Sequence, residues 1–203
     1  AIGVMSGSAL EGLDIAFAEF HESGGAWQYT LRASDCYTYP KEWVEKLRKA
    51  ASLSAPDYLL LHAEYGHYIA QEVNRFIEAH QLHYQVQLIS CHGHTIFHIP
   101  DKKVTAQLGD GAAIAGVTGI NVVSDLRSMD VALGGKGAPV VPVGEKLLFG
   151  EYNCFLNIGS HAYITAHTPQ GLIAFDICAA NKILNMLAQL AGETYDMVGK
   201  IAA

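Results

Sequence analysis

The sequence predicts an α/β fold in two lobes, because its expected strands and helices come in an order that starts again partway along. Residues 1–138 are expected to form a β-β-β-α-β-α-β module, and residues 139–203 the start of a β-β-β-α module. A glycine-bearing hairpin opens each module, with Gly3 and Gly7 in the first and Gly159 in the second. Two modules that open alike predict two lobes, with their boundary within residues 134–142.

The strands of the first lobe are identified by a glycine-bearing turn after the first of them, by alternation of apolar and polar residues at 13–20, and by a buried apolar run at 86–93. They are expected at residues 1–7, 13–20, 27–39, 86–93 and 120–125, with a short extended stretch at 105–109. Helices are expected at residues 42–52 after Pro40, at 55–80, and at 110–119, which Gly119 ends. A three-stranded meander followed by alternating helices and strands predicts a five-stranded mixed sheet flanked by helices.

The second lobe is expected to begin with a short helix around Lys146, followed by a hairpin of residues 153–159 and 162–167. A strand at 173–177 and a helix at 179–191 complete this part. The chain starts inside a strand-like run and ends on a helix after Asp196, so we expect that a few residues precede Ala1 and that the second lobe is incomplete.

Composition narrows the class of protein. Of 203 residues, 50% are hydrophobic and 16% charged, and the mean hydropathy is +0.17. A chain of this length and apolar content can form a sizeable hydrophobic core. The net charge of −7 argues against a nucleic-acid partner. No apolar run approaches membrane-spanning length and no signal peptide opens the chain, so we expect no membrane partner. The four cysteines form no CxxC pair, which predicts free thiols in a reducing cytoplasm; they are Cys36, Cys91, Cys154 and Cys178.

The turn at residues 5–14, MSGSALEGLD, contains serines, glycines and two acids between two expected strands. Small residues let backbone N–H groups face a phosphate, hydroxyls add donors, and a nearby acid can hold Mg²⁺ through water. The alternative is an ordinary polar hairpin turn. The segment is not a P-loop, because no GKS or GKT follows a strand.

Three histidines follow the strand at residues 86–93. The spacing of His92, His94 and His98 would allow zinc binding. A polar loop after a strand would equally place them in a ligand cleft at the carboxyl edge of the sheet. A substrate-side or structural role for His92 and Thr95 explains the pattern better than a metal site does.

Charged residues also follow the strand at 120–125. Arg127 lies between Asp125 and Asp130, and its planar guanidinium could orient an anionic or hydroxylated substrate. The alternative is an internal Arg–Asp pair. Glycines and prolines crowd the following residues, 134–142, which is typical of backbone that closely approaches a ligand.

Asp176 lies at the expected end of a strand, and Asn181 at the start of the following helix. A carboxylate in that place could act as a general base. The alternative is a helix N-cap, a position at which aspartate is favoured.

Six segments, in order and spanning nearly the whole chain, resemble motifs of the anhydro-N-acetylmuramic acid kinase family. The family's MSGTSLDGxD resembles residues 5–14, SHGxTxxHxP resembles 90–100, and QxGD resembles 107–110. Its TGIxVVxDFRxxDxAxGGxGAPLVP resembles residues 118–142, LNIGGxxNxT resembles 156–165, and FDxGPxN resembles 175–181. The resemblance implies the two-lobed actin-like (ribonuclease H-like) sugar kinase fold.

The resemblance also implies an activity. Members of this family use ATP, with Mg²⁺, to phosphorylate the 6-oxygen of an anhydro-amino-sugar while water opens its 1,6-anhydro ring, a step of cytoplasmic peptidoglycan recycling. A homodimer is implied as well. By its match to FDxGPxN, Asp176 is the expected base that activates the water.

The motif matches assign two further groups of residues. The expected ATP-phosphate residues are Gly7, Ser8, Ala9, Leu10, Glu11, Gly12, Leu13, Asp14, Asn157 and Gly159. The expected substrate-side residues are His92, Thr95, Arg127 and Asp130. No residue is assigned to a protein-bound metal.

The chain departs from the family pattern at Ser8, Ala9, Glu11 and Met129, and at two places in the second lobe. Residues 159–163, GSHAY, stand in place of GGxxN in the second hairpin, and residues 178–181, CAAN, replace GPxN. Side chains then stand where the family has glycine beside phosphate. A second hypothesis is therefore a degenerate, non-catalytic homologue that binds a sugar or a protein partner.

Overall fold

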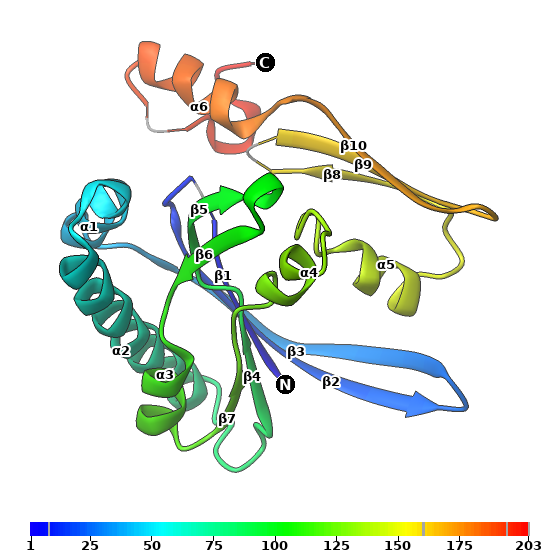
Figure 1. Cartoon of the computed structure of the whole chain (residues 1–203), viewed down its shortest axis with the longest axis horizontal. Coiled ribbons are helices and arrows are strands. Elements are labelled where there is room, and N and C mark those ends of the chain that lie inside the picture. The colour runs from blue at the N-terminus through cyan, green and yellow to red at the C-terminus, as the bar shows by residue number, and fades with distance from the viewer. Residues whose placement is uncertain (8, 160, 194, 203) are drawn as a thin grey trace. The chain divides into compact units, whose positions relative to one another are not determined.

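A computed structural model describes residues 1–7, 9–159, 161–193 and 195–202. The chain divides into two compact units, Ala1–Ala138 and Pro139–Ala203. Strand order in the main sheet of the first unit is β3-β2-β1-β4-β7 (Figure 1). These strands are β1 (Ile2–Ser6), β2 (Gly12–Ser23), β3 (Ala26–Thr38), β4 (Leu88–Cys91) and β7 (Asn121–Val123). The predicted five-stranded mixed sheet is confirmed.

The pairing of β1 determines the direction of its neighbours. It runs antiparallel to β2, with Ile2 opposite Phe17, and parallel to β4, with Ile2 opposite Ile89. Strand β7 in turn runs parallel to β4. The carboxyl ends of β1, β4 and β7 therefore lie at the same edge of the sheet.

The core of this unit lies between one face of the sheet and two helices, α1 (Lys41–Lys49) and α2 (Ala55–Ala79). Alternate residues of β1, Ile2 and Val4, are buried, while Met5 is exposed on the other face. Helix α2 contributes residues at helical spacing, which are Tyr65, Ile69, Val73 and Phe76, all fully buried. Burial of this apolar stripe holds the 25-residue helix α2 against the sheet.

Local signals define the helix ends. Ser54 caps α2, its Oγ accepting a hydrogen bond from the backbone N–H of Asp57 at 3.3 Å. Asp110 caps α3 (Gly111–Thr118), and Gly119 ends that helix with φ +69°. Among the described residues, no helix is both long and apolar enough to cross a membrane.

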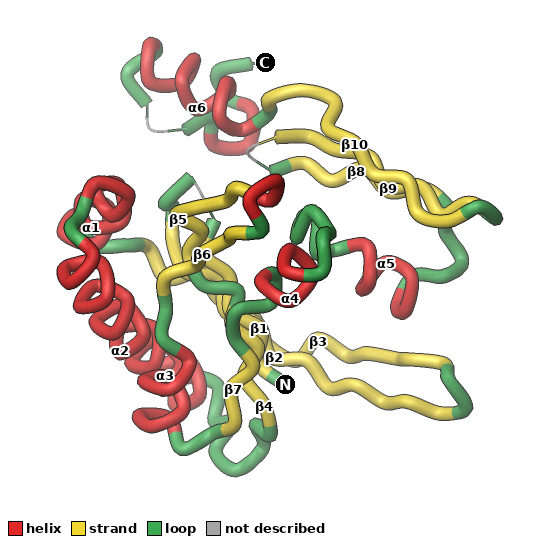
Figure 2. Tube along the Cα trace, viewed as in Figure 1, coloured by secondary structure: helices red, strands yellow, loops and turns green. Residues whose placement is uncertain are grey.

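The segment after β4 corrects the expectation of a polar loop. Residues His94–Ile99 form β5, which pairs antiparallel with β6 (Val104–Leu108), as Figure 2 shows. β-branched and aromatic residues predominate in β5, and Gly93, with φ +69°, turns the chain from β4 into β5. A short helix, α4 (Ser128–Ala132), was also not expected.

The second unit is a three-stranded antiparallel sheet of order β10-β9-β8 with two helices. Its elements are α5 (Pro142–Leu148), β8 (Cys154–Ile158), β9 (His161–Thr168), β10 (Gly171–Ala179) and α6 (Asn181–Leu190). The predicted hairpin is confirmed. Helix α6 begins two residues later than expected, because Ala179 still pairs with His161 of β9.

Two glycines in helices make a matched test of packing between α2 and α3. A Cβ at Gly66 of α2 would lie 2.7 Å from the carbonyl oxygen of Asp110, whereas a Cβ at Gly116 of α3 would meet nothing within 4 Å. We expect Gly66→Ala to lower the free energy of unfolding by about 1–3 kcal/mol. Gly116→Ala should raise it by up to about 1 kcal/mol, since alanine favours helix. Urea unfolding of both variants checks this; equal effects would contradict the packing described.

Candidate functional site

Three loops meet at the carboxyl edge of the first unit's sheet. They follow β1, β4 and β7, and the backbone N–H of His92 donates to the carbonyl of Val4 across that edge at 3.0 Å. Ligands of open α/β sheets bind outside the carboxyl ends of parallel strands. The sheet topology therefore brings the loops that carry the predicted site residues of this unit to one edge.

The turn after β1 is tight. The backbone N–H of Leu10 donates to the carbonyl of Gly7 at 3.2 Å, and Leu10 has a left-handed φ of +58°. Leu13 is fully buried in the core, so only its backbone is available to a ligand. Ala9 and Glu11 are exposed, whereas Ser8 lies outside the described residues.

Gly12 and Asp14 already belong to β2. A Cβ at Gly12 would lie 2.8 Å from the carbonyl oxygen of Tyr37 on β3, so no side chain fits there. Asp14 is exposed and pairs with Cys36. Burial first, and then the hydrogen bond and charge of Asp14, raise the pKa of the Cys36 thiol to about 11.

A buried hydrogen-bonded chain links this turn to the histidine segment. The Tyr39 hydroxyl donates to Ser6 Oγ at 2.8 Å and lies 2.6 Å from the Tyr65 hydroxyl. Ser6 Oγ lies 2.9 Å from His94 Nδ1. Because Tyr39 has one proton and gives it to Ser6, Tyr65 donates to Tyr39, and Ser6 has its own proton free for His94.

His94 is therefore a neutral, anchored residue. Burial lowers its pKa to about 4, with the charge of His92 as the second cause. An uncharged Nδ1 accepts the Ser6 proton and leaves the ring proton on Nε2. The last residue of β1 and the first of β5 are thus held together at the sheet edge.

Arg127 is buried against the loop that follows α4. Its Nε donates to the carbonyl of Gly137 at 2.7 Å, and its Nη1 donates to Thr95 Oγ1 at 3.0 Å. Its Nη2 lies 3.3 Å from His98 Nε2. In the described part of the chain the guanidinium bonds no carboxylate, so the alternative of an internal Arg–Asp pair is wrong.

Asp130 holds the same loop from the other side. Its Oδ2 accepts the backbone N–H of Gly137 at 2.6 Å. Gly137 has φ +63°, and a Cβ there would lie 2.5 Å from a methyl of Val131. Only glycine fits this backbone, and the loop is pinned by Arg127 and Asp130 together.

A cavity of about 340 Å³ opens between β4, β6, α3 and the end of β7. Its polar lining includes His92, Gln107, Asp110, Ser124 and Asp125. Two lining atoms, the hydroxyl of Tyr58 and Oε1 of Gln107, are buried without a hydrogen-bond partner among the described residues. The cavity thus offers polar groups that a ligand with several hydroxyls could bond.

The expected substrate-side residues therefore form two groups. His92 lines the cavity, and burial lowers its pKa, with the charge of Arg127 as a smaller cause. The second group lies around Gly137 and does not line the cavity; it comprises Thr95, Arg127 and Asp130. Within the described residues, no group of three His, Cys, Asp or Glu side chains is arranged to hold a metal ion.

In the second unit, three residues stand side by side across the sheet. Asn157 of β8 is opposite Tyr163 of β9, and Tyr163 is opposite Asp176 of β10. Directly paired residues project from the same face of a sheet. Tyr163 was missed as a site residue; the alternation in AYITAH predicts its strand, but only the register places it between Asn157 and Asp176.

Asp176 is exposed within β10, three residues before the strand ends, and a bulge follows it at Ile177. The residue preceding α6 is Ala180, which makes no side-chain cap. The alternative that Asp176 caps the helix is therefore wrong, and so is the expectation that it ends its strand. Gly159 is exposed at the end of β8, and its carbonyl accepts the backbone N–H of Asn181 at 3.0 Å.

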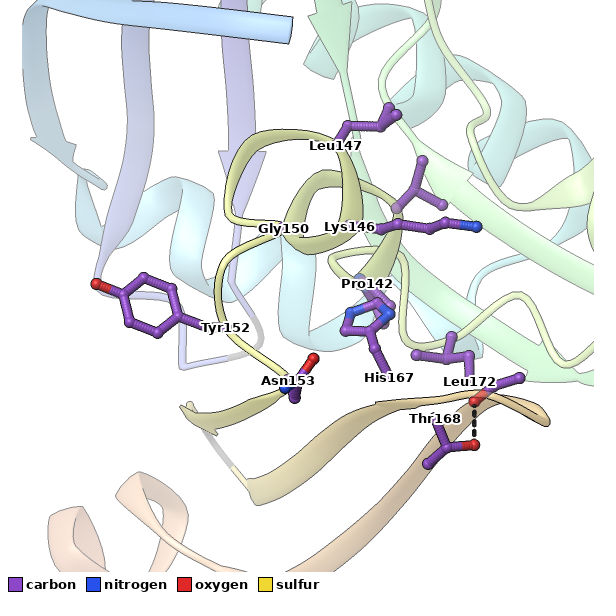
Figure 3. Close-up of a pocket in the computed structure, with 11 residues that line it drawn as sticks. Pro142, Lys146, Leu147, Gly150, Tyr152, Asn153, His167, Thr168 and Leu172 are labelled. Atoms are coloured by element: carbon purple, nitrogen blue, oxygen red, sulfur yellow. Dashed lines mark hydrogen bonds between the residues drawn. The ribbon is translucent and has the colours of Figure 1, made fainter. Parts of the chain in front are cut away.

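Helix α5 packs a polar cluster against the second sheet. Glu145, 4% exposed, accepts a hydrogen bond from Nδ2 of Asn157 at 2.8 Å. Its Oε2 lies 3.8 Å from Nε2 of His167. His167 also lines a cavity of about 770 Å³ between α5 and the β9–β10 turn, beside Pro142 and Lys146 (Figure 3). No sequence motif pointed to Glu145, because its contacts join a helix to strands of the second sheet.

Comparison with known proteins agrees with this architecture. The profile of the anhydro-N-acetylmuramic acid kinase family matches residues 1–203. Curated anhydro-N-acetylmuramic acid kinases match the whole chain at 37% identity in Rhizorhabdus wittichii, 34% in Haemophilus influenzae and 36% in Zymomonas mobilis. The chain spans 59%, 54% and 60% of the lengths of these relatives.

A mixed α/β chain with a central mixed sheet is consistent with the fold of a sugar kinase. Given the match over its full length, the chain belongs to the anhydro-N-acetylmuramic acid kinase family.

The neutral state of His94 makes stability depend on pH. Its pKa is about 4 in the folded protein and about 6.5 when unfolded, so the unfolded chain binds more protons between these values. This contribution is complete above pH 6.5 and is lost as pH falls toward 4. Between pH 7 and pH 5 we expect it to remove about 2 kcal/mol of unfolding free energy.

Urea unfolding at both pH values, compared with His94→Gln, measures this contribution. Glutamine does not titrate, so the variant should lose about 2 kcal/mol less than the unsubstituted protein over the same interval. Equal losses in the two proteins would show that His94 is not held neutral by the fold.

Proposed function

We propose that this protein is an ATP-dependent kinase that opens the 1,6-anhydro ring of anhydro-N-acetylmuramic acid and phosphorylates its 6-oxygen. The observation that carries this proposal is the row in the second unit, where Asp176 stands exposed on the same sheet face as Asn157. Membership of the family supports the reaction and the sugar.

Asp176 is the proposed general base. Its carboxylate takes a proton from water as the water oxygen bonds to the anomeric carbon, and the bond from that carbon to the 6-oxygen breaks. The electron pair of the broken bond stays on the 6-oxygen, which attacks the γ-phosphorus of ATP and releases ADP. One water and one phosphoryl group are thereby added to the sugar.

The proposed ATP-phosphate residues are those of the turn after β1, together with Asn157 and Gly159. In the turn, Gly7 and Leu10 contribute backbone, and Leu13 does so too because its side chain is buried. Exposed carboxylates such as Asp14 are ligands that Mg²⁺ accepts directly or through water. Bound with ATP, Mg²⁺ would offset the charge of the phosphates.

The proposed sugar-side residues act in two ways. His92 lines the cavity of about 340 Å³, where a hydroxylated ligand could bond the unpartnered atoms of Tyr58 and Gln107. Thr95, Arg127 and Asp130 would act by holding the loop at Gly137, whose backbone is then offered to the substrate.

We further propose that the two units are the lobes of the actin-like kinase fold, and that the protein is cytoplasmic and homodimeric. Cys36, Cys91, Cys154 and Cys178 are free, in keeping with a reducing compartment. The apolar side chains of Ile173, Phe175 and Ile177 on β10 are about half exposed, which supports a second lobe completed by further chain.

Transfer of the γ-phosphate from labelled ATP tests the function. With the complete gene product, label should appear in the sugar when the anhydro-amino-sugar and Mg²⁺ are present. A sugar with an open ring serves as the control acceptor and should take up far less. Sugar binding without transfer would instead support the non-catalytic homologue.

Substitution of Asp176 tests its role. Because Asp176→Asn removes the base while keeping the shape, we expect turnover to fall by about a hundredfold or more and thermal stability to stay nearly unchanged. Asp176→Ala should be partly rescued by added formate, which can replace the missing carboxylate. Near-normal turnover of Asp176→Asn would remove this residue from the chemistry.

A further inference from the structure

Glu145 is a buried carboxylate whose surroundings the proposed reaction does not explain. It lies in α5 with 4% of its surface exposed, and its Oε1 accepts the Nδ2 proton of Asn157 at 2.8 Å. Among the described residues, Oε2 of Glu145 has no hydrogen-bond partner, and neither has Nε2 of His167. Burying a carboxylate is unfavourable unless hydrogen bonds compensate, so the bond to Asn157 dominates its environment.

This bond fixes which way the Asn157 amide is turned. A carboxylate only accepts hydrogen bonds, so the branch of the amide that faces it must be the NH₂ group. The assignment does not depend on how the oxygen and nitrogen of the amide were placed. Oδ1, an acceptor, is therefore the branch of the amide that is turned away from Glu145.

An acceptor suits a different partner from the one expected at Asn157. Phosphate oxygens need donors, and the negative charge of Glu145 behind the amide disfavours a phosphate there. Oδ1 instead suits a hydroxyl or a water bound to a cation, which both donate. In the proposed reaction, a donor of this kind is a water in the coordination shell of the Mg²⁺ that accompanies ATP.

The sheet register extends this arrangement to the proposed base. Tyr163 stands between Asn157 and Asp176. Its pKa is raised by burial and then by the charges of Glu145 and Asp176, so its hydroxyl stays protonated. One buried carboxylate thus anchors one end of a row that ends at Asp176.

We propose that Glu145 is a positioning residue for nucleotide binding: it holds the Asn157 amide so that Oδ1 is offered to the hydrated Mg²⁺ of ATP. The inference rests on the proposed function, since that function supplies the nucleotide. The proposal changes the role of Asn157: its side chain accepts a hydrogen bond from metal-bound water and does not donate one to phosphate.

A double-mutant cycle in the complete gene product tests this. The dissociation constant of a non-hydrolysable ATP analogue is measured with and without Mg²⁺ for Glu145→Met, Asn157→Leu and the double variant. Each single substitution should weaken binding about tenfold with Mg²⁺, equivalent to one lost charge-assisted bond, and much less without it. The double variant should bind no more weakly than either single one.

Two controls separate positioning from loss of structure. Glu145→Gln keeps an acceptor oxygen and should bind the Mg²⁺–nucleotide within a few-fold of the unsubstituted protein. Glu151→Gln removes an exposed carboxylate from the chain just after α5 and should change nothing. If Glu145→Met does not fold, Glu145→Gln together with amide exchange measured by NMR still decides. Protected Nδ2 protons of Asn157 are expected, and exchange as fast as that of an exposed asparagine would overturn the proposal.

The remaining outcomes are distinguishable. Normal nucleotide binding with no effect of Glu145→Met, or effects that multiply in the double variant, would overturn the positioning role and leave the proposed function standing. If the unsubstituted protein binds no nucleotide, the proposed function fails and this inference fails with it.

Discussion

The parallel pairing of β1, β4 and β7 is the constraint on which the first unit depends. Because β1 pairs in register with β4 from Ile2 opposite Ile89, and β4 with β7, the three strands end at one edge of the sheet. The turn after β1, the histidine segment and the loop bearing Arg127 follow those ends. A change in the direction of β1 alone would separate the loops that form the candidate site.

Buried polar contacts then hold these loops in place. Ser6, Tyr39 and His94 form a hydrogen-bonded chain behind the turn, and Arg127 and Asp130 grip the backbone of Gly137. Polar groups removed from water stabilise a fold only when their hydrogen bonds are made. Each of these side chains bonds a different segment of the chain, so the positions of the loops and the local stability are linked.

Sequence patterns predicted the elements that depend on local signals. Alternation identified β2, a buried apolar run identified β4, and the αL glycine at residue 119 identified the end of α3. The missed β5 carries two of the three histidines, His94 and His98, in a stretch that resembles a polar loop, and its pairing with β6 makes it a strand. Asp176 was placed at a strand end because pairing of Ala179 with β9 is not visible in sequence.

The candidate site divides in the same way. The motifs identified Asn157 and Asp176 as candidate site residues. Only the register of the strands shows that both stand beside Tyr163. Glu145 had no motif at all, since its bond to Asn157 joins a helix to a strand twelve residues later. Motif resemblance thus finds groups that could touch ligand, whereas the groups that orient them appear only in three dimensions.

The proposed reaction couples addition of water to transfer of phosphate at one site. The most direct test is the mass and NMR spectrum of the sugar that the complete gene product makes from ATP and anhydro-N-acetylmuramic acid. We expect a product heavier by one phosphoryl group and one water, with an open ring and phosphate on the 6-oxygen. A phosphorylated sugar whose anhydro ring is intact, or an opened ring without phosphate, would contradict it.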